Sequence, residues 1–417
     1  MKESLNESIR EDGLRIISKH VRGTNKVRVV VIANVGSAYD NVPGTHHFRE
    51  HLAFSGSTTR SAVDISHMIG RYFLAHNALT GKLNILFWGE AAYIRFKELL
   101  DVLLDIYVNP TFPEELIEKE KGVILNEIIL RRQDDVQMGF EKLFRMLWKT
   151  NPIRCHGIGT PKNIEKISRD HLVAAHRKWY LPSNTVVVGT GRINHDELVS
   201  AAYSAFPVNH KKVEHRHWDH EADVLPMRHE ATILREGREQ AVILAGVKIA
   251  PFGEETRSQL ALLNAMLGGG MDSLLWQEIR EKRGFTYDVE SGFESPHFRL
   301  GFCMYFITEV MPEYISETKK LIRDIVCEVP LERGHFQRQK EALLDSWLVS
   351  NETAQDWEDT ILNRIVYEGK PVSHFKNYTN KRMRQLSRVT FNQICALRDR
   401  LLTRERLACV IVRPVDR

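Results

Sequence analysis

The chain has 417 residues, 43% of them hydrophobic and 27% charged, which is typical of globular proteins and long enough for two or three domains. The 58 basic and 54 acidic residues nearly cancel, and no long run of one sign occurs. This balance argues against nucleic acid as a partner. Five scattered cysteines without a C-x-x-C pair suggest neither a disulfide framework nor a thiolate zinc site, and fit a reducing compartment.

The chain begins with MKESLNESIREDG, which contains acidic residues and no apolar core. This composition argues against a secretory signal and against an organelle presequence. The longest apolar runs are short and broken by charge, so we expect no membrane span. Together these features predict a soluble, cytoplasmic protein with neither a membrane nor a nucleic-acid partner.

Runs rich in β-branched residues alternate with helical patterns along the chain, which predicts sheets packed with helices. The runs are residues 26–35, 82–91, 184–191 and 240–249. A polar stretch without periodicity, residues 208–230, divides the chain into halves of similar size. We therefore predict an N-terminal domain over 1–207, a linker over 208–230 and a C-terminal domain over 231–417.

The two halves resemble each other in sequence. Residues 105–121 and 324–340 share a helix end, a proline and a charged second helix. Two further segments, beginning KISR and QLSR, follow in the same order, with Ile167 and Leu386 in matching places. Matched pairs in one order predict that a single α+β unit is duplicated, with an offset of about 219 residues between the copies.

The stretch HHFREHLAFSGS, residues 46–57, contains three histidines and a glutamate. On a helix, His47 and His51 lie one turn apart on one face, with Glu50 beside them. Neutral imidazole suits zinc, and a catalytic zinc takes three protein ligands and leaves a fourth position to water. His46 points about 100° away and is not expected to be a ligand. The alternative is a solvated helix end that contains histidines by chance.

The repeat offers a test of that alternative. At the repeat offset the motif maps near Met266, Gly269 and Gly270, none of which can bind a metal through its side chain as histidine does. The second half thus keeps the scaffold and lacks the polar cluster, which favours function over a structural need. Four more histidines lie in the linker without a helical frame, and we interpret them as solvated: His210, His215, His217 and His220.

Two histidines do not complete a catalytic zinc site, so another ligand must come from elsewhere. A carboxylate on a second helix is the simplest source. Residues 114–135 show helical apolar spacing, and within them Glu120 and Glu127 lie seven residues apart, on one face. Spacing alone leaves both glutamates as candidates.

With these residues in place, the sequence resembles the pitrilysin or insulinase family of inverted zincins, which includes mitochondrial processing peptidase and its bacterial relatives. The H-x-x-E-H motif matches His47, Glu50 and His51, and the 75 residues between His51 and Glu127 match that family's spacing. The resemblance implies Zn²⁺ held by His47, His51 and Glu127. It further implies that Glu120 supports the site from outside the ligand set.

The resemblance also implies a reaction and a fold. Zinc lowers the pKa of its bound water towards about 7 and polarises the scissile carbonyl. Glu50 would take the proton from that water and pass it to the leaving amine. The implied fold is α+β, with two similar domains, each a mainly antiparallel sheet packed with helices, that form a clam-shell.

The segment NALT, residues 77–80, precedes an alternating strand and resembles the family's substrate-binding edge strand. An extended peptide can add to such an edge through backbone hydrogen bonds. Asn77 and Ala78 match the family motif, whereas Leu74 and Ala75 stand where the family usually has two glycines. Side chains there would narrow the groove. The alternative is a plain entry from a turn into a strand.

Residues 267–293, LGGGMDSLLWQEIREKRGFTYDVESGF, resemble the family's glycine-rich loop, helix and R-x6-Y pair. The resemblance implies that Tyr287 donates towards the oxyanion and that Arg280 contacts the substrate backbone, since both side chains are donors. The alternative is a basic amphipathic helix that ends at Gly284. Three consecutive glycines, 268–270, predict a loop in either case.

We therefore expect a zinc endopeptidase that cleaves peptides or processes leader or presequence segments. Its small-subunit relatives imply a homodimer, or a heterodimer with a related subunit. The alternatives are a non-catalytic subunit and an enzyme that needs its partner; loss of the zinc ligands typifies the former, and here all are present.

Overall fold

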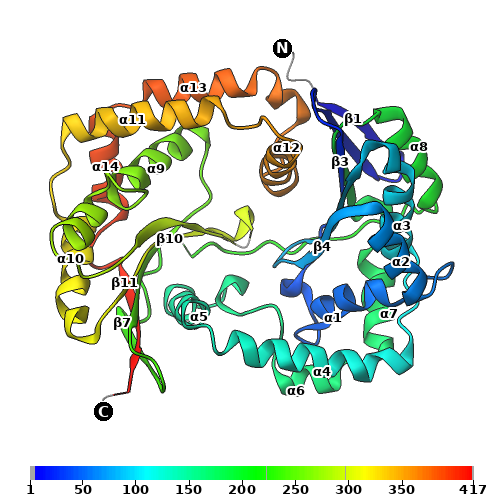
Figure 1. Cartoon of the computed structure of the whole chain (residues 1–417), viewed down its shortest axis with the longest axis horizontal. Coiled ribbons are helices and arrows are strands. Elements are labelled where there is room, and N and C mark those ends of the chain that lie inside the picture. The colour runs from blue at the N-terminus through cyan, green and yellow to red at the C-terminus, as the bar shows by residue number, and fades with distance from the viewer. Residues whose placement is uncertain (1–4, 222, 296, 416–417) are drawn as a thin grey trace. The chain divides into compact units, whose positions relative to one another are not determined.

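The computed structural model describes residues 5–221, 223–295 and 297–415, which form two compact units (Figure 1). Unit 1 contains the described residues up to Ile129, together with His156–His217 and Asn351–Asn377. Unit 2 contains Leu130–Cys155, Trp218–Ser350 and the described residues from Tyr378 onward. Each unit therefore includes a segment from the sequence half that supplies most of the other unit.

Unit 1 is built on a six-stranded sheet in the order β1-β2-β6-β3-β5-β4. Strands β2 and β6 pair in parallel, and the other neighbours pair antiparallel. The strands are β1 Asn6–Ile9, β2 Arg15–His20, β3 Lys26–Ala33, β4 Phe73–Thr80, β5 Ile85–Ala92 and β6 Thr185–Gly191. Strand β4 is an edge strand, as the sequence predicts for the segment that contains NALT.

Helices cover both faces of this sheet, which explains why β3 reads as a continuous apolar run rather than an alternating one. Its odd-numbered valines face a core formed with α2 (Ala62–Tyr72), α3 (Phe96–Val108) and α8 (His195–Ala205). Helix α12 (Ala354–Ile361) covers strands β3 and β6, and the π-helical turn Leu362–Tyr367 follows it and packs against it. A second core joins α1 (Thr45–Leu52), α4 (Glu114–Arg131), α6 (Pro161–Lys166) and α7 (Arg169–Trp179).

The segment Asn351–Asn377, here called the exchanged segment, comes from the C-terminal half but belongs to unit 1. Glu358 on α12 accepts hydrogen bonds from Arg28 of β3 at 3.0 and 3.3 Å, and both side chains are 5% exposed. The Lys19 ammonium of β2 lies 4.5 Å from the centre of the Trp357 ring. A buried ion pair and buried aromatic contact therefore fix this segment on the sheet.

Unit 2 repeats the architecture with a five-stranded sheet in the order β7-β11-β8-β10-β9. Strands β7 and β11 pair in parallel and the others antiparallel, so the order and directions match β2-β6-β3-β5-β4. The strands are β7 Glu230–Arg235, β8 Ala241–Ile249, β9 Val289–Glu294, β10 Phe302–Val310 and β11 Ala408–Pro414. The predicted α+β fold with two structurally similar domains is confirmed.

The helices of unit 2 also lie on both faces of its sheet. One face contacts a core that includes residues of α9, α10, α11 and α14, and the other contacts α5. The helices are α5 Asp135–Leu147, α9 Glu254–Leu267, α10 Ile315–Cys327, α11 Arg333–Leu348, α13 Tyr378–Arg388 and α14 Phe391–Leu401. Helix α5 comes from the N-terminal half, so α5 and α12 are exchanged reciprocally.

Helix caps fix the register of the repeat. Ile167 precedes the cap of α7 and donates its N–H to Ile164, and Val389 precedes the cap of α14 and donates to Leu386. The structural counterpart of Ile167 is therefore Val389, and the predicted match to Leu386 is wrong by three residues. One helical turn separates the two, so a wrong match still pairs buried apolar residues.

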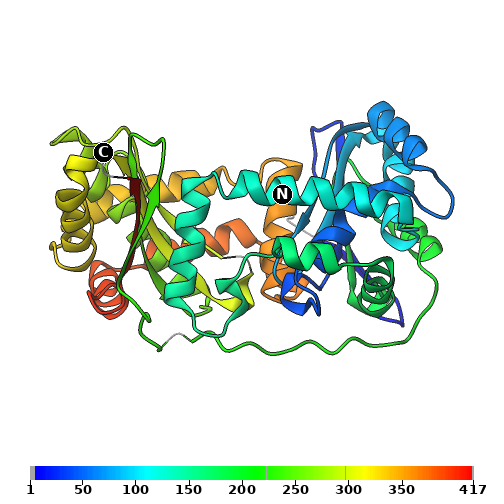
Figure 2. The same ribbon diagram turned by 90° about the horizontal axis from the view of Figure 1, so that it is seen from below.

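The division into units differs from the predicted sequence halves at α5 and α12. Residues 207–221 contain no helix or strand and appear as an extended green stretch in Figure 2. Most of this stretch is exposed, as expected for a linker, but two side chains anchor it. His215 bonds the Asn184 side chain through Nε2 at 2.9 Å, and the Glu221 carboxylate accepts the backbone N–H groups of residues 149–151.

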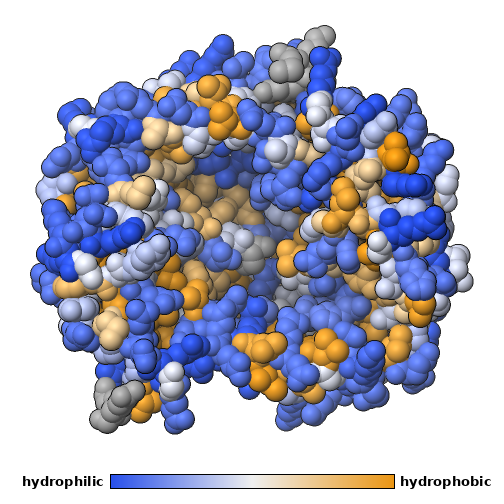
Figure 3. All heavy atoms as spheres, viewed as in Figure 1, coloured by the Kyte–Doolittle hydropathy of each residue, from blue (hydrophilic) through white to orange (hydrophobic). Residues whose placement is uncertain are grey.

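The described part of the chain has no helix both long enough and apolar enough to cross a bilayer. The face drawn in Figure 3 is mainly hydrophilic, with scattered apolar patches. Such patches are usual on folded proteins.

Candidate metal centre

The helix that carries the H-x-x-E-H motif, α1, begins at a tightly constrained turn. Gly44 precedes it with φ of 99°, and a Cβ there would lie 2.7 Å from the carbonyl oxygen of Ile158. Asp40 accepts the backbone N–H groups of Gly44 and His46 at 2.8 and 3.0 Å. These bonds satisfy donors that a helix start leaves open, so they fix where α1 begins.

Asp40 also determines the role of His46. The Nδ1 atom of His46 lies 2.5 Å from Oδ1 of Asp40, and the imidazole is buried. His46 is therefore held by the helix cap and lies outside the group of residues that converge below. This placement agrees with the prediction that His46 points away from the site of His47 and His51.

Apolar packing sets α1 against α4. Phe48 and Leu52 on α1 are fully buried in one core with Ile124 and Ile128 of α4. Because side chains at i and i+3 or i+4 share a helix face, this packing brings Glu127 of α4 to the side of α1 that carries the motif. The predicted helix over 114–135 is confirmed, with an end at Arg131.

The structure brings His47, His51 and Glu127 together. The Oε2 atom of Glu127 lies 3.6 Å from Nε2 of His47 and 3.5 Å from Nε2 of His51, and one ligand atom from each lies within 4.8 Å of the others. A tetrahedral zinc site with bonds of about 2.1 Å has ligand–ligand edges of about 3.4 Å. The three side chains therefore fit a zinc ion in type, number and spacing.

Glu120 accepts a hydrogen bond from the imidazole of His51 on the side away from Glu127. The Nδ1–H group of His51 donates to Oε1 of Glu120 at 2.7 Å, which leaves Nε2 directed at Glu127. A carboxylate in this position fixes the tautomer and orientation of a metal-binding histidine. The structure thus gives different positions to Glu120 and Glu127, which helical spacing alone could not tell apart.

Electrostatics support a cation at this place. Burial lowers the pKa of His51, but hydrogen bonds to Glu120 and Glu127 outweigh burial and raise the pKa to about 9. The hydrogen bond from His51 in turn lowers the pKa of Glu127. A site that holds a proton this firmly between carboxylates is one that a divalent cation can occupy in its place.

Glu50 lies on α1 between the two histidines and outside the group of three. Its Oε2 atom accepts a hydrogen bond from the Thr80 hydroxyl at 2.8 Å. Burial raises the pKa of the Glu50 carboxyl, and the Thr80 hydrogen bond opposes that rise. The sequence did not single out Thr80, although it is the last residue of the NALT segment.

Arg49 is a second residue that the sequence did not single out. Its guanidinium is fully buried and lies 3.7 Å from the ring centre of Tyr180 and 5.0 Å from that of Phe87. It donates to the carbonyl oxygen of Tyr107 at 2.9 Å. The signal available in the sequence was a charged residue on the side of α1 that its apolar residues predict to be buried. The aromatic rings that contact Arg49 complete the core behind the H-x-x-E-H motif.

Asn77 and Ala78 lie on edge strand β4. The Asn77 side chain is exposed and accepts the N–H of Ala78 at 2.9 Å. Leu74 stands at a break in the β4–β5 register and is 62% exposed. The side chain that replaces a family glycine therefore projects from the strand.

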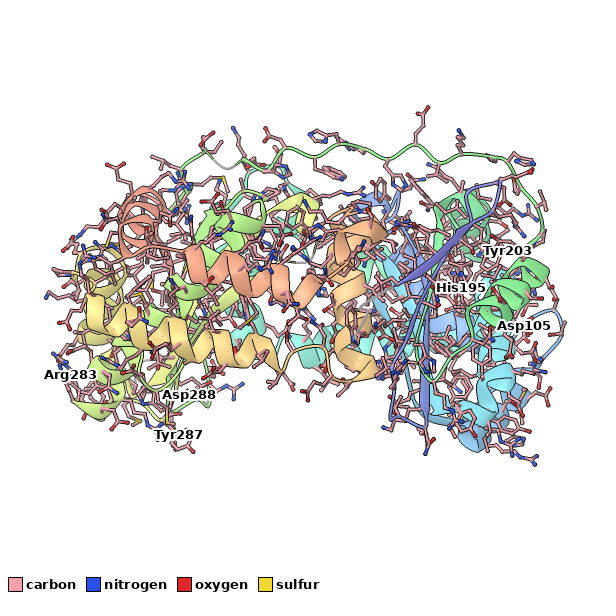
Figure 4. All side chains as sticks on the ribbon, turned by 90° about the horizontal axis from the view of Figure 1, so that it is seen from above. Asp105, His195, Tyr203, Arg283, Tyr287 and Asp288 are labelled. Atoms are coloured by element: carbon pink, nitrogen blue, oxygen red, sulfur yellow. The ribbon has the colours of Figure 1, made fainter. Side chains whose placement is uncertain are left out.

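Arg280 and Tyr287 belong to unit 2, not to the unit that carries the metal cluster. The Arg280 guanidinium lies 5.1 Å from the ring centre of Tyr287 and 4.2 Å from that of Trp276. Tyr287 is 86% exposed and projects beside Asp288 (Figure 4). Arg280 lies in the π-helical turn Trp276–Glu281, and Tyr287 precedes β9, so the two form a pair on one unit.

The ligand set stands alone in the part of the chain described. Over residues 5–221, 223–295 and 297–415, the one group of three or more converging histidines, cysteines or acids consists of His47, His51 and Glu127. The five cysteines form no disulfide. The four linker histidines, His210, His215, His217 and His220, are not part of this group.

Models of two protein families match the chain. Residues 15–160 match the family described as insulinase, peptidase family M16, and residues 166–343 match the family described as peptidase M16 inactive domain. Together the two matches cover well over half of the chain.

Individual relatives agree with the family models. An uncharacterized zinc protease of Rickettsia bellii is 31% identical over 81% of this chain and 82% of its own length. An uncharacterized zinc protease of Mycobacterium leprae is 26% identical over 96% of this chain and 89% of its own length.

Two solved structures share the fold. A peptidase M16 inactive domain from Pseudomonas fluorescens has a TM-score of 0.85 and 20% identity, and the match covers 99% of this chain and 98% of that one. A protease from Helicobacter pylori has a TM-score of 0.86 and 16% identity, over 99% of this chain and 100% of that one.

Proposed function

The chain belongs to peptidase family M16, the insulinase family, and on that premise we propose that it is a zinc-dependent endopeptidase. Its substrates would be peptides, or leader or presequence segments that it processes. The observation that carries the proposal is the convergence of His47, His51 and Glu127 with Glu50 beside them. A family member that served only as scaffold would have no need of this set.

The proposed roles follow from the chemistry of each side chain. His47, His51 and Glu127 would hold the zinc ion, which as a Lewis acid polarises the scissile carbonyl and favours deprotonation of water. Glu50 accepts a proton from the attacking water, whose oxygen forms a bond to the carbonyl carbon. The C–N bond then breaks, and Glu50 returns that proton to the leaving nitrogen.

Substrate recognition is proposed for two places. The exposed edge of β4, with Asn77 and Ala78, offers backbone hydrogen-bonding groups to an extended peptide. On unit 2, Arg280 and Tyr287 are donors suited to the substrate backbone and to the developing oxyanion. The Arg280 guanidinium over the Tyr287 ring favours a joint role for this pair.

A second candidate function is that of a non-catalytic or partner-dependent subunit. It is favoured by the match of residues 166–343 to a domain described as inactive. In either case we propose a dimer, with a second copy or a related chain, and a cytoplasmic location, which fits five cysteines that form no disulfide.

One assay separates these candidates. The purified chain is loaded with zinc and mixed with a library of internally quenched peptides, and the Glu50→Gln variant serves as the control. We expect cleavage by the wild-type chain that a zinc chelator abolishes. A zinc-loaded chain that cleaves nothing alone, but cleaves when a related chain is added, would favour the partner-dependent subunit.

A further inference from the structure

The carboxylate of Glu50 is held by a residue outside the metal-binding helix. Thr80, the last residue of β4, donates its hydroxyl to Oε2 of Glu50 at 2.8 Å. One carboxylate oxygen is thus engaged, and Oε1 remains to accept a proton. A general base must present a lone pair within hydrogen-bond reach of the proton that it removes, so a fixed rotamer matters as much as the pKa.

Thr80 is fixed in turn by the β4–β5 turn. The Gly81 N–H donates to the Asn84 carbonyl at 2.8 Å and closes this turn. The backbone N–H groups of Ser37 and Ala38 donate to the carbonyl oxygens of Gly81 and Lys82, both at 3.0 Å. These bonds join the turn to the loop that leads into α1, the helix that carries Glu50.

We propose that Thr80 is a positioning residue for Glu50, and that the β4–β5 turn holds Thr80 in place. The role of Glu50 as base rests on the proposed function, whereas the placement of its carboxylate can be tested without it. If Thr80 had only a structural role, any side chain of similar shape would replace it.

The first test compares two substitutions at one position. Thr80→Val keeps the shape and removes the hydroxyl, and Thr80→Ser keeps the hydroxyl. We expect Thr80→Val to lower kcat about 10- to 100-fold, with KM, bound zinc and the unfolding midpoint unchanged. Thr80→Ser should recover most of the loss. Equal kcat in Thr80→Val and the wild type, or no recovery in Thr80→Ser, would overturn the proposal.

A structural readout separates this proposal from the peptidase assignment. Crystal structures of the wild type, Thr80→Val and Thr80→Ser report the Glu50 rotamer whether or not any peptide is cleaved. We expect Glu50 to turn away from its wild-type position in Thr80→Val alone. An unmoved Glu50 in Thr80→Val would refute the positioning role, whereas a wild-type chain that cleaves no peptide would refute the function and leave this result to stand.

Discussion

The helix α1 in unit 1 and the helix α9 in unit 2 follow the same strand of the repeated sheet, yet their sequences differ in kind. Aligned at the C-terminal ends of the two helices, His47, Glu50 and His51 correspond to Leu262, Ala265 and Met266. The match predicted from the 219-residue offset is therefore wrong by four residues, or one helical turn. The unit 2 residues belong to the apolar helix whose side chains fill the main core, where Leu262 and Met266 are fully buried. The fold therefore tolerates either an apolar helix or a polar, metal-binding one at this position.

This difference shows that scaffold and site are separable within one chain. The sheet order, the parallel pair and the exchanged helix recur in both units, while the ligand cluster occurs in one. Function resides in side chains placed on a fold that does not itself require them. The repeat thus supplies an internal control for every substitution in the motif.

The largest expected effect comes from removing a ligand. His47→Ala, His51→Ala and Glu127→Ala each leave two protein ligands, so bound zinc and peptidase activity should both fall to background. Zinc per chain is measured by elemental analysis after dialysis. His67→Ala, an exposed histidine of unit 1, is the control and should retain the metal. Full zinc in the Glu127→Ala variant would contradict the assignment.

The second effect removes the base and keeps the metal. Glu50→Gln should lower kcat by about 10²- to 10⁴-fold at unchanged zinc content, because the amide cannot accept the proton. Single-turnover peptide hydrolysis measures this loss. Glu118→Gln, on the exposed side of α4, is a matched control. An active Glu50→Gln enzyme would refute the role of Glu50.

The third effect tests the two exchanged helices against each other. Glu358→Ala on α12 leaves Arg28 buried with one partner fewer, and should lower the free energy of unfolding by about 3 kcal/mol. Glu141 on α5 of unit 2 pairs with Arg131 nearer the surface, so Glu141→Ala should cost less than about 1 kcal/mol. Urea unfolding monitored by tryptophan fluorescence measures both. Equal losses of unfolding free energy in the two variants would contradict the expected difference between α12 and α5.

The smallest expected effect concerns Glu120. Glu120→Gln weakens the hydrogen bond that orients His51, and should reduce zinc affinity by about 10- to 100-fold. Competition with a fluorescent chelator measures this affinity. Glu115→Gln, in the first turn of α4, serves as the control. A loss as complete as that of Glu127→Ala would make Glu120 a ligand.

The sequence predicted the local features of the fold well because they depend on nearby residues. The run predicted over 26–35 is β3 at Lys26–Ala33, and that over 240–249 is β8 at Ala241–Ile249. The run over 82–91 begins later, as β5 at Ile85, since Gly81–Asn84 form the turn that closes on β4. Periodicity does not reveal where a turn takes up the first residues of an apolar run.

The features that the sequence did not predict depend on distant contacts. The exchange of α12 rests on a buried pair between Arg28 and Glu358, 330 residues apart, which no local pattern reveals. The bond between Thr80 and Glu50 likewise requires the fold to bring a strand end beside a helix. For the ligand set, spacing left Glu120 and Glu127 open, and the resemblance to a known family selected Glu127. Its geometry now agrees with that selection.

The most direct test of the central claim is anomalous diffraction at the zinc absorption edge from crystals of the chain grown with zinc. We predict one strong anomalous peak per chain, about 2.0–2.2 Å from Nε2 of His47, Nε2 of His51 and a carboxylate oxygen of Glu127. A peak elsewhere, or none beside these three residues, would contradict the account.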